Sequence, residues 1–161
     1  MTHALRLSAY VSILLTGAIF GFFYAWVCST MWGLDAARPI VAVEAMQAMN
    51  ASVRNGVFAP IFFGPGPVCL LTAALAWVAG QRMAAIPFWL AGTVYILGGN
   101  VLTFVYLIPM NEALALQAPQ TASHASEIWA NYSATWQGYN ITRTVFCGAS
   151  LLLAAIGLRN L

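Results

Sequence analysis

The chain has 161 residues, of which 61% are hydrophobic and only 6% are charged, and its formal net charge is +2. A soluble domain carries about 25% charged residues, so this composition excludes an ordinary soluble protein and indicates an integral membrane protein in contact with a lipid bilayer. The few charges are scattered, so we expect no nucleic-acid partner. No repeat or linker divides the sequence, and we treat residues 1–161 as a single membrane domain.

The first predicted element is a membrane-spanning helix at about 6–30. The run from Leu7 to Leu34 carries no charge and exceeds the ~20 residues that a helix needs to cross a bilayer. Trp26 and Trp32 near its end are typical of the aromatic belt that anchors helices at the membrane surface.

An amphipathic helix is predicted next, at about 38–54. At 100° per residue, its polar side chains share an arc of roughly 120°, and its methionines point the other way. Two arrangements fit this pattern. The polar stripe either folds over the bundle toward Arg143 or faces water while the helix lies flat in the membrane interface. The residues of the stripe are Glu44, Gln47, Asn50 and Arg54.

The second and third spans are predicted at about 58–80 and 85–108, again from long uncharged runs. Asn100 lies inside the third span, where a buried amide requires hydrogen-bond partners. Pro109 should kink or end this helix, because proline lacks a backbone N–H. Asn111 then either caps a short following helix or takes part in a binding site.

The fourth span is predicted at about 134–158 and carries a charge inside the membrane. Its uncharged run is too short to cross alone, so the helix must include Arg143. Trp129, Trp136, Asn140 and Arg143 recur at intervals of three or four and therefore share one helical face. The predicted fold is an all-α integral membrane protein, a four-transmembrane-helix bundle with the extra amphipathic helix on its outer side.

Arg143 either extends its side chain toward the membrane surface or faces the bundle interior and pairs with an acid. The acids nearest in the predicted topology are Glu44 and Glu112. We expect Glu44 to be the partner, because Gln47 and Asn50 share its face and can complete the hydrogen bonding.

The arginines suggest an orientation. Four spans place both termini and the turn at Arg82 on one side, which has no acid, and all four acids on the other. We therefore expect both termini to be cytoplasmic, and the protein to lie in a bacterial cytoplasmic membrane.

Neither metal nor organic cofactor is expected from the side chains available. The two histidines, His3 and His124, fall outside the predicted spans. The three cysteines lie on different helices without a C-x2-C pair, which disfavours zinc and dithiol sites.

Four stretches together resemble the anthrone-oxygenase-like family of small four-helix membrane proteins. They are FFYAWVCSTMWGL, EAMQAMNASVRN, VYLIPMNEALA and the W-x6-W-x3-N-x2-R pattern that ends at Arg143, within about residues 17–157. The resemblance implies oxidation of anthrones to anthraquinones with molecular oxygen, and no firmly attached cofactor. This chain departs from the family where a histidine often flanks the motif's asparagine, because Tyr139 and Ile141 stand beside Asn140.

We therefore expect an oxidase or oxygenase that acts on a flat, apolar phenolic or quinol-type molecule in an outer-side pocket. Arg143 and Asn140 would stabilise a developing enolate, and Glu44 would act as the base. The expected substrate-binding residues are Gln47, Asn50, Asn100, Asn111, Trp129 and Trp136. The alternative is a lipid- or quinone-binding protein, or an accessory subunit of a larger membrane complex. The sequence is also compatible with a homo-oligomer. A transporter fits least, since no repeat is present.

Overall fold

The computed structural model describes residues 3–161, and every regular element in this range is a helix. Three helices run without interruption over His3–Ala36, Arg82–Ala115 and Ala122–Arg159, with 34, 34 and 38 residues. Each is long and apolar enough to cross a membrane. They correspond to the first, third and fourth predicted spans, and all three continue beyond the expected ends.

The long helices are divided where their hydrogen-bond pattern changes. The first comprises α1 (His3–Ala25), η1 (Trp26–Thr30) and α2 (Met31–Ala36), and helix α3 (Pro39–Ser52) follows it. Next come α4 (Phe58–Phe63) and α5 (Pro65–Val78). The remaining elements are α6 (Arg82–Tyr95), η2 (Ile96–Val101), η3 (Thr103–Leu107), α7 (Ile108–Ala115) and α8 (Ala122–Arg159).

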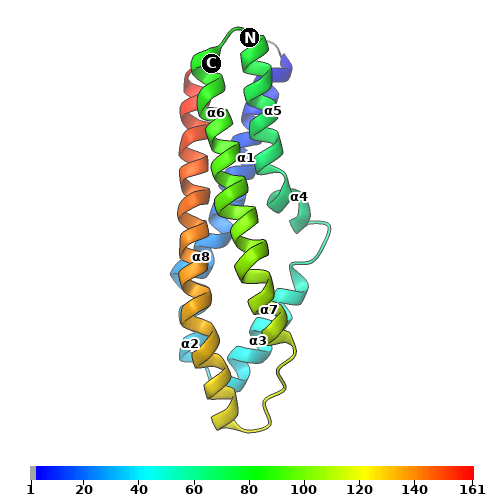
Figure 1. The fold of residues 1–161 in the computed structure, drawn as a ribbon, viewed down its shortest axis with the longest axis vertical. Helices are drawn as coiled ribbons and strands as arrows, with labels where there is room; N and C mark the ends of the chain where they lie inside the picture. The colour runs from blue at the N-terminus through cyan, green and yellow to red at the C-terminus, as the bar shows by residue number, and fades with distance from the viewer. Residues whose placement is uncertain (1–2) are drawn as a thin grey trace.

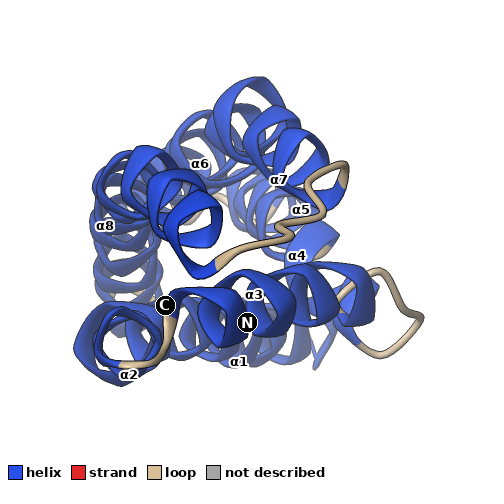
Figure 2. Ribbon diagram, turned by 90° about the horizontal axis from the view of Figure 1, so that it is seen from below, coloured by secondary structure: helices blue, strands red, loops and turns tan. Residues whose placement is uncertain are grey.

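Four helices pack around a common axis. α1 contacts α5 and α8, and α6 contacts the same two helices. Figure 1 shows both termini at one end of the molecule and α2, α3 and α7 toward the other. Seen from that second end, α3 runs across the molecule (Figure 2), where it packs against α8, α7 and α2.

The second predicted span is broken into α4 and α5. Pro65 and Pro67 lack the backbone N–H that would continue the helical hydrogen bonding, and a side chain at Gly64 would collide with the Pro60 carbonyl oxygen. α5 alone has 14 residues, fewer than a membrane span needs. The structure thus contains three spans by length and composition, together with this shorter apolar helix.

The sequence predicts a kink or an end of the third long helix at Pro109, and the helix does not end there. The preceding η3 is a π-helical segment, in which the Ile108 N–H donates to the Thr103 carbonyl five residues back. A new α-helical turn then begins at Ile108, and Pro109 lies in its first turn. Proline is tolerated there because that N–H has no partner to lose, so the helix continues to Ala115.

α3 forms where an amphipathic helix is predicted, but it is rotated differently from both expected arrangements. Ala42, Val43 and Met46 are fully buried against the rest of the molecule. The apolar face therefore contacts protein rather than lipid. Glu44 lies on the opposite, exposed face.

Candidate functional site

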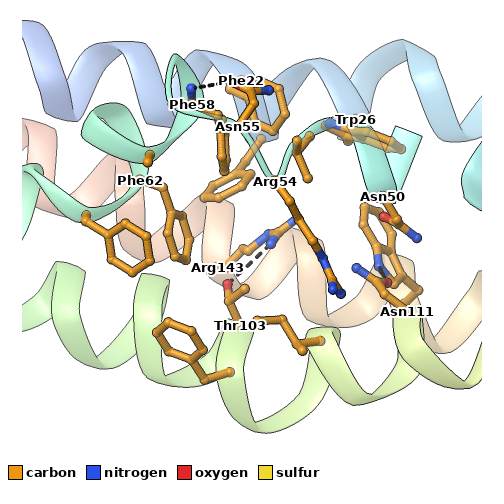
Figure 3. Close-up of a pocket in the computed structure, with 18 residues that line it drawn as sticks. Phe22, Trp26, Asn50, Arg54, Asn55, Phe58, Phe62, Thr103, Asn111 and Arg143 are labelled. Carbon is orange, nitrogen blue, oxygen red and sulfur yellow. Dashed lines mark hydrogen bonds between the residues drawn. The ribbon is translucent and has the colours of Figure 1, made fainter. Parts of the chain in front are cut away.

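A cavity of about 450 Å³ opens between α1, the 53–57 loop, α4, the η3–α7 region and α8. Figure 3 shows aromatic side chains on several sides of Arg143. A mostly apolar slot with a few convergent polar groups is typical of a small-molecule site. The aromatic lining residues are Phe22, Phe23, Trp26, Phe58, Phe62, Phe63, Phe104 and Trp136, and the polar ones are Asn50, Arg54, Asn55, Thr103, Asn111 and Arg143.

Arg143 is a buried cation in the wall of this cavity, with 6% of its surface exposed. Its Nε donates to Asn140 Oδ1 at 2.9 Å, and its Nη1 donates to Thr103 Oγ1 at 3.3 Å. The guanidinium carbon lies 3.8 Å from the ring centre of Phe23 and 5.5 Å from that of Trp136. Attraction to these ring faces offsets part of the cost of burying the charge.

No carboxylate pairs with Arg143 among the described residues, so the expected partnership with Glu44 does not form. Glu44 is exposed and lies outside the cavity lining. Glu112 instead pairs with Arg54, with 3.4 Å between Oε1 and Nη2 and with both side chains exposed. Neutral oxygens and aromatic faces therefore take the place of the predicted counterion. No described residue accepts a hydrogen bond from the Nη2 atom of Arg143.

Asn140 orients Arg143 rather than facing the cavity. It is 1% exposed, and its Oδ1 accepts the hydrogen bond from the arginine Nε. Its Nδ2 donates to the Phe23 carbonyl oxygen on α1 at 3.3 Å. The amide therefore fixes the guanidinium relative to both α1 and α8.

Asn111 forms a second polar group in the cavity wall. Its Oδ1 accepts from the Tyr132 hydroxyl at 2.7 Å and from Trp136 Nε1 at 2.9 Å. An indole N–H can only donate, so the amide orientation is fixed and Nδ2 points away from Trp136. Asn111 lies inside α7 and is not a helix cap.

The polar stripe of α3 is divided among three environments. Asn50 lines the cavity beside Asn111 (Figure 3). Gln47 donates through Nε2 to the carbonyl oxygens of Leu114 at 2.7 Å and Gln117 at 2.9 Å, and so holds the end of α7. Glu44 faces outward. Of the predicted stripe, Asn50 and Arg54 at its C-terminal end line the cavity.

Two other expected binding residues have contacts elsewhere. Asn100 Nδ2 donates to the Phe62 carbonyl oxygen at 3.1 Å, beside the break between α4 and α5. The same oxygen accepts from the Tyr95 hydroxyl at 2.6 Å. Trp129 Nε1 donates to Asp35 Oδ1 at 2.9 Å. Neither Asn100 nor Trp129 lines the cavity.

Sequence reasoning did not identify several residues that shape the site. Phe23 supplies the ring against Arg143, and Thr103 supplies an acceptor. Tyr132 fixes Asn111. Thr103 shares a helical face with Asn100, and Tyr132 shares a face with Trp129 and Trp136. Helical spacing therefore indicates that both residues lie near the predicted site. Nothing in the local sequence distinguishes Phe23 from its aromatic neighbours.

The arrangement places a cation with an unused donor against an apolar slot. A fixed donor of this kind can stabilise negative charge on an oxygen of a bound molecule, because it acts more strongly beside apolar side chains than in bulk water. Among the described residues that line the cavity, the ionisable side chains are Arg54 and Arg143. The cavity therefore provides stabilisation of an anion rather than an acid–base pair.

Comparison with known proteins identifies the family. No curated protein and no solved structure matches this sequence. The model of the family described as anthrone oxygenase matches residues 57–153, from the loop before α4 into the last turns of α8. This match includes Thr103, Asn111, Trp136 and Arg143 and covers more than half of the chain. The chain belongs to the anthrone oxygenase family.

Proposed function

We propose that this protein is a membrane oxygenase that binds a flat, apolar, anthrone-like ketone in the cavity and oxidises it with molecular oxygen. The observation that carries the proposal is the position of Arg143, a buried cation without a carboxylate partner among the described residues, at the wall of an aromatic slot. Family membership and the three apolar helices support the same assignment.

The proposed reaction begins with loss of a proton from the ring carbon opposite the ketone. The negative charge is delocalised onto the ketone oxygen, where the guanidinium of Arg143 stabilises it. Molecular oxygen then bonds to the carbon, and the peroxide anion formed takes up a proton from water to give a hydroperoxide. Loss of water from the hydroperoxide breaks its O–O bond and leaves a second ketone, so one oxygen atom enters the product and the other leaves as water.

The first proton passes to water in this proposal. Glu44, the base expected from the sequence, lies outside the cavity and faces away from it. Arg143 instead makes the bound ketone a stronger carbon acid by stabilising its anion. Water reaches the cavity past Arg54, whose side chain is 60% exposed.

We further propose a membrane placement with four spans, in which α4 and α5 together provide the second crossing. Both termini then lie on the cytoplasmic side of a bacterial membrane. The common end of the two termini in Figure 1 supports an even number of crossings.

Turnover of anthrone tests the proposal. Oxygen uptake and anthraquinone absorbance are followed with purified protein in vesicles, and spontaneous oxidation in empty vesicles is subtracted. We expect Arg143→Gln to reduce the catalysed rate by about 100- to 1,000-fold, the usual loss when an oxyanion donor is removed. Arg159→Gln, at the end of α8 and away from the cavity, is the matched control and should keep the native rate.

An unchanged rate in folded Arg143→Gln protein would contradict the proposed role of this side chain. Binding of anthrone by the native protein without faster oxygen uptake would favour the lipid- or quinone-binding alternative. Thermal unfolding of each variant shows whether the fold is retained.

A further inference from the structure

We infer that Asn50 and Asn111 form a second oxygen subsite, which binds a hydroxyl or hydroperoxide on the ligand carbon opposite the oxygen held by Arg143. This inference rests on the proposed function and adds a specificity determinant to it. Both asparagines line the cavity, on α3 and α7 respectively, and Figure 3 shows both at the same end of it.

The hydrogen bonds of Asn111 define the first half of the subsite. Its Oδ1 is occupied by the Tyr132 hydroxyl and by the indole N–H of Trp136. Its Nδ2 therefore points away from both, and no described residue accepts a hydrogen bond from it. Asn111 thus offers the cavity a donor whose orientation two other side chains hold in place.

Asn50 has the opposite orientation. Its Nδ2 is buried and has no hydrogen-bond partner of good geometry, although the phenol of Tyr132 lies close enough to interact with it. That phenol donates its own hydrogen to Asn111, so only its oxygen can face the Asn50 amide. Because Nδ2 is enclosed by protein although Asn50 lines the cavity, Oδ1 is the end of the amide that remains for the cavity.

A donor beside an acceptor suits a hydroxyl group, which can accept from Asn111 Nδ2 and donate to Asn50 Oδ1. A carbonyl oxygen can make only the first of these bonds and would face the Asn50 oxygen without a hydrogen between them. The subsite therefore distinguishes a carbon that carries O–H from one that carries a ketone.

Trp136 contacts both proposed oxygen sites. The guanidinium carbon of Arg143 lies 5.5 Å from the indole ring centre, and Asn111 Oδ1 lies 2.9 Å from the indole edge at Nε1. The two sites are thus held on the face and at the edge of one indole. Both sites line the same cavity, so one ligand that lies along the indole can contact both.

The subsite lies where the reaction adds oxygen. When the carbanion bonds to molecular oxygen and is protonated, the new hydroperoxide carries the O–H that Asn50 accepts. Loss of water removes this donor and leaves a ketone beside the Asn50 oxygen. Asn50 and Asn111 therefore favour the intermediate over the product and promote product release.

Ligand binding tests the inference without turnover. Quenching of tryptophan fluorescence, to which Trp26 and Trp136 in the cavity contribute, is measured without oxygen in detergent. The ligands are anthrone, anthraquinone and oxanthrone, the ketone with a hydroxyl opposite its carbonyl. We expect native protein to bind oxanthrone about tenfold more tightly than either of the others.

Substitutions at Asn50 and at Arg143 distinguish the contributions of the two oxygen sites to binding. Asn50→Leu should reduce the preference for oxanthrone to less than about twofold, and Asn50→Asp, which keeps an acceptor, should restore it. Asn131→Leu replaces an exposed asparagine of α8 outside the cavity and should behave as native. Arg143→Gln should weaken the binding of all three ligands and leave the preference for oxanthrone unchanged.

Equal affinity of native protein for oxanthrone and anthraquinone would overturn the inference, as would a preference that persists in Asn50→Leu. The affinities of the native protein for the three ligands test the inference even where a variant fails to fold. If the protein oxidises anthrone but shows no preference for oxanthrone, the subsite alone is rejected. If the preference depends on Asn50 but anthrone is not oxidised, only the proposed oxidation is rejected. If none of the three ligands binds, both proposals fail.

Discussion

Arg143 shows how a charge is accommodated inside an apolar helix bundle without a carboxylate. The sequence predicts an acid beside it, because opposite charges reduce the cost of burial. In the structure, the Phe23 ring and two neutral oxygens from Asn140 and Thr103 share that role. An ion pair would neutralise the cation, whereas these contacts leave its charge available to a ligand.

Asp35 is the carboxylate with the most side-chain contacts, and none was expected from the sequence. Its Oδ1 accepts from Trp129 Nε1 at 2.9 Å and from Ser133 Oγ at 2.6 Å, and its Oδ2 accepts from Gln137 Nε2 at 2.9 Å. Trp129, Ser133 and Gln137 all lie on α8. Asp35 thus joins the end of α2 to the helix that carries Arg143.

Replacement of Asp35 by alanine should destabilise the protein by about 1–3 kcal/mol, because the buried donors of Trp129 and Ser133 lose their acceptor. Thermal unfolding in detergent measures the change. Glu127→Ala, which removes an exposed acid on α8, is the control and should unfold near the native temperature. Equal midpoints for the two variants would show that the Asp35 contacts do not contribute to stability.

At the scale of elements, regular hydropathy predicts where the helices lie but not where their hydrogen bonding changes. The three long helices follow from uncharged runs, and the buried face of α8 follows from the spacing of Trp129, Trp136, Asn140 and Arg143. The π-helical segments η1, η2 and η3 do not follow from the hydropathy pattern, because hydropathy does not report the hydrogen-bond pattern within a helix.

The rotation of α3 about its axis is likewise not predicted by the hydropathy pattern. Glu44 and Asn50 lie at opposite edges of a polar arc of roughly 120°, so a rotation that brings Asn50 to the cavity carries Glu44 away from it. Periodicity defines the arc but not which edge faces the protein. The burial of Met46 against the bundle decides between them.

Gly98 in η2 offers a test of close packing between helices. A side chain there would collide with the Phe146 side chain on α8. We expect Gly98→Ala to lower the free energy of unfolding by about 1–3 kcal/mol, the usual cost of overpacking. Thermal and denaturant unfolding measure it.

The matched control for that substitution is Gly138→Ala. Gly138 lies in α8 with no neighbouring atom within 4 Å of the added methyl, so alanine should stabilise the helix by up to about 1 kcal/mol. Similar effects of the two substitutions, with the same sign, would contradict the packing explanation.

At the scale of the whole molecule, the proposed topology predicts which residues share a membrane face. Single cysteines are introduced as His3→Cys, Arg82→Cys and His124→Cys in a chain whose exposed Cys28 is replaced by serine. We expect an impermeant thiol reagent to label positions 3 and 82 from the cytoplasmic face and position 124 from the other.

The remaining native thiols, Cys69 and Cys147, are buried and provide the background. Any other grouping of the three positions would reject the four-span topology. Labelling of positions 3 and 82 from opposite faces would indicate that α4 and α5 do not cross the membrane together.

The ion pair between Arg54 and Glu112 joins the 53–57 loop to α7 beside the cavity. Both side chains are about three-fifths exposed, at 60% and 61%, and such a pair is worth at most about 1 kcal/mol. That energy favours the paired state only about fivefold at equilibrium, so the contact is broken for a substantial fraction of the time. We therefore expect this pair to add little to the residence time of a ligand, which should depend on the contacts inside the cavity.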